Sequence, residues 1–375
     1  MREVLIDLEA VAHNTKLLVQ AAGDAKVMAM VKADGFGHGA VAVARTALRH
    51  GVSWLGVTSP WEALALRHAN VTAPMLTWLY APDDDLAPLL EADVDLSVPS
   101  TAHLRAVAMA ATKAAIRANI HLKVDTCLSR DGAALAEWRA LVAMARQYEE
   151  SGVIHVRGMW SHLTETGVHG DPSTSRQISQ FQAASRAAEA TGVRPALRHI
   201  AGSAALLHNP ESRFDLVRAG IALYGVEPIP GYSRGLRPAL TVTAAVLLVK
   251  RVYNDGTPPY GYDHVTDRAT NLALLAMGFA NGVPRRATGR AEVLIHGVRC
   301  RVAGRIAMDH IVVDVGDLPV RAGDQAVVLG PGDQGEPTAT DWATWADTNA
   351  HEILTGIGSR VPRRYRLGDE ADSAP

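Results

Sequence analysis

The alternation of short apolar runs with amphipathic segments constrains the fold of this chain more than any other feature. The segments between the runs, such as 40–50 and 138–150, repeat apolar residues every three or four positions, as a helix on a sheet does. Apolar strands alternating with helices are typical of a covered parallel sheet. Eight such units predict an α/β fold that begins with a (β/α)8 TIM-like barrel. The runs span residues 27–31, 54–57, 74–79, 94–98, 121–125, 156–162, 197–201 and 216–225.

The pattern changes after the Gly- and Pro-bearing junction at 231–240. From there, strand-like segments follow one another with turn residues between them, which indicates a mostly antiparallel β domain. The sequence therefore predicts two domains, a barrel over residues 1–232 and a β domain over 233–375. Residues 366–375 are polar and charged, and we expect a disordered tail there.

Composition excludes several classes of function. The net charge is −2, and the basic residues are scattered, so we expect neither nucleic acid nor a membrane surface as a partner. Cys127 and Cys300 are the only cysteines, too few for a disulfide framework or a zinc site, and we predict no metal centre. The N-terminus has no apolar signal core, and no window reaches transmembrane length. The expected location is the cytoplasm.

Distinctive polar side chains stand where the predicted barrel strands end. Any one of them, taken alone, is typical of a structural hydrogen bond or a salt bridge. The active sites of such barrels lie at the carboxyl ends of the strands, so six residues there together predict a site. The Gly-bearing turns at 202–206 and 219–225 can offer backbone N–H groups to an anion. A lysine opposite a phosphate cradle favours pyridoxal phosphate. The six residues are Lys32, Lys123, Arg130, His162, Ser203 and Arg218.

Several motifs together resemble those of one family. The segment VKADGFGHG, which contains Lys32, is similar to that family's cofactor-lysine motif. Over nearly its whole length the chain resembles alanine racemase, a fold type III pyridoxal phosphate enzyme. The resemblance implies a homodimer in which the partner's β domain completes each active site. The other matching motifs are LKVDT-x-x-x-R (122–130), SH (161–162), RH-x-x-x-S (198–203), VRxGIALYG (217–225), a Tyr-Gly pair (260–261), GxxxG-x-x-R (278–285) and GRIAMD (304–309).

The resemblance implies a two-base interconversion of L-alanine and D-alanine. Lys32 matches the residue that holds pyridoxal phosphate as a Schiff base and then exchanges the Cα proton on one face. Inversion needs a second acid–base group on the opposite face, because one base cannot serve both. Tyr260 of the partner subunit matches that group, and His162 matches its hydrogen-bonding neighbour.

Three further matches concern the cofactor ring and the substrate. Arg218 matches the residue facing the pyridine nitrogen, and a guanidinium keeps its proton, so the ring nitrogen must act as an acceptor. Arg130 matches the residue that contacts the cofactor's phenolic oxygen and the substrate carboxylate. Lys123 matches a lysine that is carbamylated in many relatives and orients that arginine.

The resemblance also assigns the phosphate cradle and a contact from the partner. Ser203, Gly220 and Ile221 match the residues around the cofactor phosphate. Met308 of the partner subunit matches the residue whose backbone N–H reaches the substrate carboxylate. Asp309 follows it in the same motif and is expected to support the site.

Several positions depart from the family pattern. Phe36 stands where relatives have a tyrosine that binds phosphate, and Gly202 replaces an asparagine. Losing a hydrogen bond to a charged group costs about 1.5–3 kcal/mol, so we expect weaker retention of the cofactor. Phe279 and Asn281 alter a motif of the substrate entrance, which leaves the amino-acid preference open.

Three alternatives to an alanine racemase remain at this point. One is a specialised or weakly active racemase for another amino acid, which the altered entrance suggests. Another is a fold type III decarboxylase, but those enzymes place a carboxylate at the ring nitrogen, whereas this chain offers Arg218. The third is a non-catalytic pyridoxal phosphate carrier. Carriers consist of a barrel alone, so the β domain with Tyr260 counts against that class.

Overall fold

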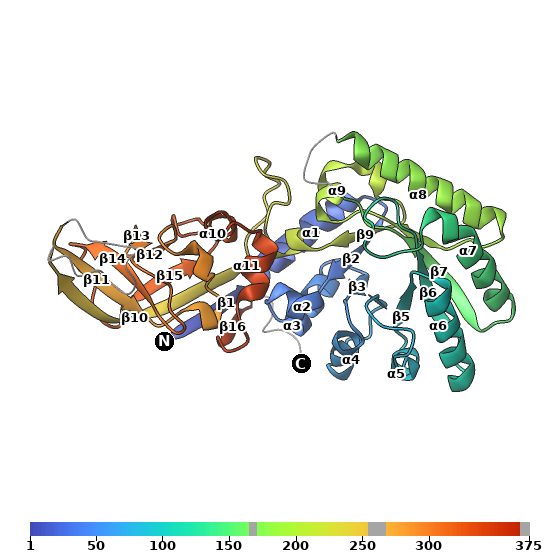
Figure 1. The fold of residues 1–375 in the computed structure, drawn as a ribbon, viewed down its shortest axis with the longest axis horizontal. Coiled ribbons are helices and arrows are strands. Elements are labelled where there is room, and N and C mark those ends of the chain that lie inside the picture. The colour runs from blue at the N-terminus through green and yellow to red at the C-terminus, as the bar shows by residue number, and fades with distance from the viewer. Residues whose placement is uncertain (165–170, 254–267, 368–375) are drawn as a thin grey trace.

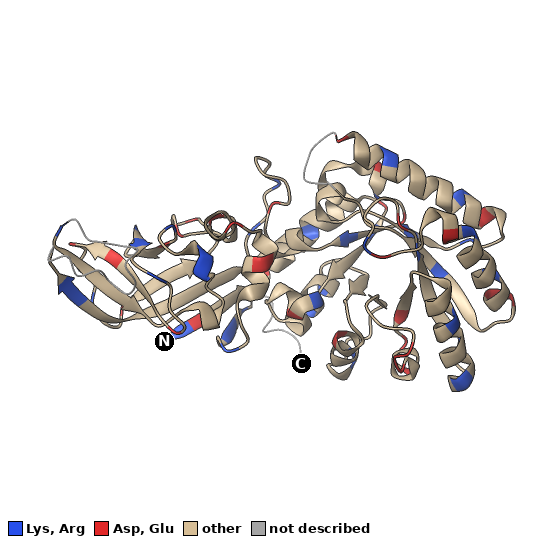
Figure 2. Ribbon diagram, in the orientation of Figure 1, with Lys and Arg blue, Asp and Glu red and all other residues tan. Residues whose placement is uncertain are grey.

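The computed structural model describes residues 1–164, 171–253 and 268–367 (Figure 1). Tyr260 lies outside the described residues. The molecule is elongated, with a barrel at one end and a β domain at the other, and helices α10 (Ala339–Ala346) and α11 (Ala350–Gly356) lie toward the barrel. Charged residues of both signs are distributed over both parts (Figure 2). Within the described residues, no helix has the length and apolarity to cross a membrane.

Eight parallel strands form the barrel that the sequence predicts. Each strand pairs with the next, and β9 pairs with β2. Backbone hydrogen bonds close the ring between β8 and β9, from Asp215 N–H to Arg198 O at 3.1 Å and from Arg218 N–H to Ala201 O at 3.0 Å. The strands are β2 (Lys26–Met30), β3 (Trp54–Gly56), β4 (Met75–Thr77), β5 (Asp95–Val98), β6 (Ala118–Lys123), β7 (Ile154–Trp160), β8 (Leu197–His199) and β9 (Leu216–Ala219).

Helices between the strands cover the outside of the barrel (Figure 1). In α6 (Thr101–Ala114), Leu104, Val107, Ala108 and Ala111 are buried, which is the three-and-four spacing of a helix on a sheet. The other helices are α1 (Leu8–Ala22), α3 (Ala40–Arg49), α4 (Pro60–His68), α5 (Ala87–Glu91), α7 (Leu135–Glu150), α8 (Pro172–Ala190) and α9 (Ser203–His208). The remaining segments are short turns: α2 (Lys32–Phe36), η1 (Pro210–Ser212) and η2 (Ile221–Tyr224).

The second domain is the predicted antiparallel β structure. Six strands pair in a closed ring in the order β10, β11, β14, β13, β12, β15 and back to β10. Its elements are β10 (Leu240–Val252), β11 (Thr270–Leu275), η3 (Phe279–Asn281), η4 (Arg285–Ala287), β12 (Glu292–Ile295), β13 (Val298–Val302), β14 (Ile311–Gly316) and β15 (Gln325–Leu329).

Both chain ends differ from the expected boundaries. Strand β1 (Arg2–Asp7), which we expected in the barrel domain, pairs with β10 and with β16 (Arg363–Arg366) in the second sheet. Its alternate residues Val4 and Ile6 are fully buried there, so the strand finds both hydrogen-bond partners and apolar cover. Arg366, expected in the tail, ends β16 and forms an ion pair with Asp7. The boundary near residue 232 stays a prediction.

Candidate active site

The segment after β2 forms a left-handed turn that carries Lys32. Ala33, Asp34 and Phe36 have φ of 52°, 51° and 52°, and Gly35 between them has φ of 61°. A left-handed conformation costs a residue with a side chain roughly 1–2 kcal/mol. The turn must therefore be held by contacts outside itself.

Those contacts come from both domains. Ala33 N–H donates to Glu62 Oε1 at 2.6 Å, and Arg363 Nε of strand β16 donates to Gly37 O at 2.8 Å. A Cβ atom at Gly39 would overlap the hydroxyl of Tyr365, and the φ of +92° at this residue also favours glycine. The last strand of the chain thus helps to position Lys32.

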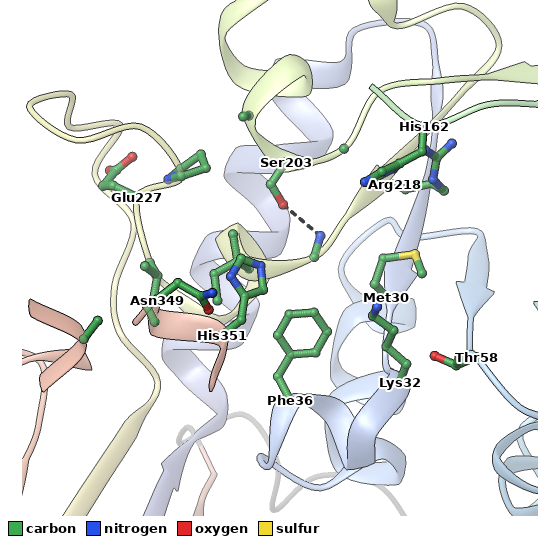
Figure 3. Close-up of a pocket in the computed structure, with 18 of the residues that line it drawn as sticks. Met30, Lys32, Phe36, Thr58, His162, Ser203, Arg218, Glu227, Asn349 and His351 are labelled. Atoms are coloured by element: carbon green, nitrogen blue, oxygen red, sulfur yellow. Dashed lines mark hydrogen bonds between the residues drawn. The ribbon is translucent and has the colours of Figure 1, made fainter. Parts of the chain in front are cut away.

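A pocket of about 800 Å³ lies at the carboxyl ends of the barrel strands (Figure 3). The same chain's β domain also contributes to its wall, through α10, α11 and the residues between them, which the sequence did not indicate. Ten of the predicted site residues line the pocket: Lys32, Phe36, Lys123, Arg130, His162, Gly202, Ser203, Arg218, Gly220 and Ile221.

Met308 and Asp309 are not among the residues that line this pocket. Both are exposed on the loop before β14, where Met308 O accepts a hydrogen bond from Ala280 N–H at 2.9 Å. Asn281 is buried and accepts from Gly278 N–H at 3.1 Å, so it shapes this turn rather than an entrance in its own chain. The roles expected of Met308 and Asp309 in a partner's site stay predictions.

Arg218 crosses the base of the pocket as a buried cation. Its Nη2 donates to Ser161 O at 2.8 Å and to Ile200 O at 3.0 Å, which fixes the guanidinium plane. Burial lowers its pKa to about 9, and the group remains protonated at neutral pH. Its Nε–H makes no hydrogen bond to the described part of the chain and is left as a donor for a ligand.

A one-way chain of hydrogen bonds runs from Arg218 through the barrel interior. Arg218 Nη1 lies 2.9 Å from His199 Nδ1, and because a guanidinium only donates, that nitrogen must accept. The proton of neutral His199 is then on Nε2, 2.9 Å from His121 Nδ1. His121 Nε2 in turn donates to Asp95 Oδ2 at 3.1 Å. Arg157 Nη1 holds the other carboxylate oxygen of Asp95 at 3.0 Å.

Burial and nearby cations lower the pKa values of both His162 and Lys32. Burial lowers the pKa of His162 to about 3, with Arg218 and other nearby cations adding to the shift. Its Nδ1 accepts from Arg218 Nη2 at 3.0 Å, so its proton is on Nε2. Burial and then Arg130 lower the pKa of Lys32, while Glu62 opposes the shift. Lys32 therefore releases a proton more readily than an exposed lysine.

The opposite end of the pocket has the form of an anion cradle. Ser203 Oγ accepts from Gly220 N–H at 2.8 Å, which fixes the hydroxyl beside the turn that begins η2. The Phe36 ring stacks on Tyr224 with 4.7 Å between centroids. A Cβ atom at Gly220 would lie 3.6 Å from Phe36 Cζ, the atom on which a tyrosine would carry its hydroxyl. His351 lies beside Phe36, with 5.7 Å between ring centroids (Figure 3).

Sequence reasoning missed three residues whose contacts position the site residues. Glu62 contacts the turn that carries Lys32. Asp95 and His121 belong to the hydrogen-bond chain that begins at Arg218. None of the three stands in a motif that sequence reasoning singled out for chemistry. The signal available was a carboxylate or imidazole within an apolar strand, at Asp95 and His121, because such a group must find a buried partner.

Comparisons with known proteins agree with this architecture. The family profile described as alanine racemase, N-terminal domain, matches residues 6–228, and the one described as alanine racemase, C-terminal domain, matches residues 239–365. The alanine racemase of Thermobifida fusca is 48% identical over 364 residues, which covers 97% of this chain and 97% of the relative. That of Streptomyces coelicolor is 44% identical over 369 residues, or 96% and 94% of the two chains.

Solved structures give the same result. The alanine racemase from D-cycloserine-producing Streptomyces lavendulae superposes with a TM-score of 0.96 at 44% identity, covering 100% of this chain and 99% of the other. The alanine racemase from Corynebacterium glutamicum gives a TM-score of 0.86 at 32% identity, covering 98% and 99%. The matches span both domains and the strands that carry the pocket, and the chain belongs to the alanine racemase family.

Proposed function

We propose that this chain interconverts L-alanine and D-alanine with pyridoxal phosphate bound in the pocket described above. The observation that carries the proposal is the pocket itself. It places the amine of Lys32, whose pKa is lowered, in the same cavity as an anion cradle at Ser203 and Gly220 and a fixed guanidinium at Arg218. The relatives with this architecture are named alanine racemases.

The residues present fit this cofactor. The Ser203 hydroxyl, oriented by Gly220 N–H, and the backbone N–H of Ile221 would hold its phosphate, and Lys32 would hold its aldehyde carbon. The Nε–H of Arg218 is the donor left for a ring nitrogen that acts as an acceptor. When bound, pyridoxal phosphate supplies an electron sink that makes the Cα proton of an amino acid acidic.

The protein's own part is to move a proton at Cα on either face. Lys32 would take or return the proton on one face, which its lowered pKa favours. Tyr260 of the partner subunit would serve the other face, so the proposal includes a homodimer. His162 is neutral and carries its proton on Nε2, so it can donate to a tyrosine oxygen and stabilise its charged form.

Arg130 would bind the substrate carboxylate, because its exposed guanidinium lines the pocket and can form paired hydrogen bonds with a carboxylate. The family comparison does not favour a decarboxylase, and Arg218 stands where such an enzyme needs a carboxylate. The cytoplasmic location expected from the sequence remains part of the proposal.

The proposal is tested with purified protein saturated with pyridoxal phosphate and given L-alanine in deuterium oxide. We expect D-alanine to form, with deuterium at Cα, and the cofactor to absorb as a lysine adduct. The Lys32→Ala variant should lose both the absorbance of the adduct and racemisation, because the amine provides the attachment and one of the two bases. Release of carbon dioxide without D-alanine, or full turnover by Lys32→Ala, would contradict the proposal.

A further inference from the structure

Glu62 carries a carboxylate and is nevertheless only 8% exposed. It is the third residue of α4, where an acidic side chain typically accepts from the backbone at the start of its own helix. Its Oε2 does so, accepting from Thr58 N–H at 2.8 Å and from Ser59 N–H at 3.1 Å. Its Oε1 instead accepts from Ala33 N–H at 2.6 Å, in a different segment. Glu62 therefore ties the start of α4 to the turn that carries Lys32.

Both peptide groups that flank Lys32 are held by hydrogen bonds. The N–H of Ala33 belongs to the peptide that follows the Lys32 Cα, and Glu62 holds that group. The carbonyl of Val31, in the peptide before it, accepts from Gly35 N–H at 2.8 Å. Ala33 has φ of 52°, which is unfavourable for a residue with a side chain. Without Glu62, one of the two anchors that direct the lysine side chain into the pocket would be lost.

The hydrogen bonds of Glu62 need a carboxylate and cannot be reproduced by an amide. Three N–H groups from two segments meet the side chain, so both of its oxygens must accept. An amide would turn its NH2 group toward one of these donors. Hydrogen bonds to a charged carboxylate are also stronger than those to a neutral group. The requirement for two acceptors thus places a negative charge in the wall of the pocket, where Thr58 and Lys32 are both lining residues (Figure 3).

The charged and titratable groups around the amine of Lys32 come from four parts of the chain. Burial and then Arg130 lower its pKa, and Glu62 acts in the opposite direction. His162 and His351 also interact electrostatically with the amine. Burial lowers the pKa of both imidazoles, so both are neutral at neutral pH. Glu62 is therefore the negative charge that opposes Arg130 at this amine.

We propose that Glu62 is a positioning residue for Lys32: its hydrogen bond to Ala33 N–H directs the lysine side chain, and its charge keeps the amine a stronger base than burial alone would leave it. Glu62 acts through Lys32 and not on the substrate. The inference rests on the proposed function for the reaction that Lys32 serves. The two effects are separable, because one depends on the reach of the side chain and the other on its charge.

Two variants separate charge from reach. Glu62→Gln removes the charge, and its single oxygen can serve only one of the two segments. Glu62→Asp keeps the charge, but its side chain is one methylene shorter and cannot reach both Ala33 and the start of α4. Asp171→Asn is the matched control, because it removes the charge of a carboxylate that caps α8 by accepting from Ser173 N–H at 2.7 Å.

The effect of the charge is tested by mixing cofactor-free protein with pyridoxal phosphate and following the absorbance of the lysine adduct from neutral to alkaline pH. Only a neutral amine adds to the aldehyde carbon, after which water leaves. Without the charge of Glu62 the pKa of Lys32 falls, so the half-maximal rate should move to lower pH in Glu62→Gln and less in Glu62→Asp. The ionisation of free pyridoxal phosphate is the same in every experiment, and Asp171→Asn should keep the native profile.

The direction of Lys32 is tested by circular dichroism in the absorption band of the adduct and by the kinetics of racemisation. Both Glu62 variants should change the dichroism and lower kcat, by up to roughly hundredfold, the loss typical of a misplaced catalytic group. The KM for alanine should change less, because the proposed carboxylate ligand Arg130 makes no hydrogen bond with Glu62. Asp171→Asn should alter neither measurement.

An unmoved pH profile in Glu62→Gln would overturn the role of the charge. Native dichroism and native kcat in Glu62→Asp, which retains the buried charge and carries this test if the amide variant does not fold, would overturn the positioning role. The adduct measurements need no turnover. An adduct that responds to Glu62 as expected, in a protein that does not racemise alanine, would contradict the proposed function and support this inference.

Discussion

The two ends of the pocket differ in how completely their polar groups are hydrogen-bonded. At the end around Arg218, the guanidinium is buried and both of its terminal nitrogens donate hydrogen bonds, which continue through His199 and His121 to Asp95. At the cradle end, Phe36 brings a ring without a hydroxyl to the edge of the pocket. The nitrogens of the neighbouring His351 ring have no hydrogen-bond partner among the described residues.

Because of this difference, substitutions at the Arg218 end should change the free energy of unfolding, whereas substitutions at the cradle end should change the affinity for the ligand. Groups in the Arg218 chain are part of the barrel interior, so changing them removes buried partners whether or not a ligand is present. At the cradle end Phe36 packs on Tyr224 and Ser203 accepts from Gly220. Substitutions that keep those contacts and change only the groups facing the ligand should alter the affinity for an anion and leave folding intact. The following predictions test that separation.

Asp95→Asn should give the largest effect and act on folding. The substitution removes the negative charge at the end of the hydrogen-bond chain that begins at Arg218, and it leaves Arg157 without its buried carboxylate. We expect the free energy of unfolding to fall by about 3–5 kcal/mol. Urea denaturation of the cofactor-free protein measures it. Asp347→Asn is the control, since its pair with Arg286 is exposed and should contribute about 0–1 kcal/mol. Similar losses of unfolding free energy in the two variants would show that the buried hydrogen-bond chain contributes no more than an exposed ion pair.

Acid should weaken the Arg218 end through its neutral imidazoles. The pKa of His162 is about 3 in the folded protein, against 6.5 ordinarily, so the unfolded chain binds more protons between these values. Stability must therefore fall as pH decreases below about 6.5, by up to ~1.4 kcal/mol per pH unit for each such group. His162→Asn keeps an acceptor for Arg218 and should reduce this slope in denaturation curves measured from pH 7 to pH 5. An unchanged slope would mean that folding does not lower the pKa of His162.

Phe36→Tyr should act at the cradle end and change affinity alone. The new hydroxyl would extend from Cζ, the atom that faces Gly220, toward the expected position of the phosphate. It should tighten binding of pyridoxal phosphate by up to about 1.5–3 kcal/mol, with unfolding free energy unchanged in the cofactor-free protein. Equilibrium titration of that protein decides the matter. A weaker complex would show that the cradle has no space for the oxygen.

His351→Phe should give the smallest effect. Its ring lines the pocket beside Phe36 and can offer an N–H donor near the place where the tyrosine hydroxyl is missing. Cofactor binding should weaken by about 0.5–1.5 kcal/mol, the range for an ordinary hydrogen bond, and by less in the Phe36→Tyr variant. Titration of both pairs forms a double-mutant cycle. Equal losses in the two backgrounds would show that His351 does not compensate for Phe36.

The sequence was sufficient for the barrel and for ten of the residues that line the pocket. Parallel strands are read directly from apolar runs, and a barrel brings all its strand ends to one face, so Lys32, His162 and Arg218 had to meet once the fold was known. The motifs shared with the family then located Gly220 and Ile221, whose backbone groups leave no signal of their own in composition.

Other features could not be read from the sequence, for physical reasons. Residue type does not report the sign of φ at Ala33 or Asp34, because their left-handed conformation is imposed by partners such as Glu62 and Arg363 that lie far away in sequence. Strand β1 reads as an ordinary apolar run, and its place in the second sheet depends on which strand edge is open to it.

The sequence by itself determined the order of strands and helices, the family, and the chemical groups available at the strand ends, because these follow from local periodicity and residue type. Only the tertiary structure decided the protonation state and the orientation of those groups. Burial makes His162 neutral, a one-way hydrogen-bond chain fixes Arg218, and a carboxylate one residue from Arg130 pairs with Lys123. Each of these depends on distances between residues that the order of the chain does not specify.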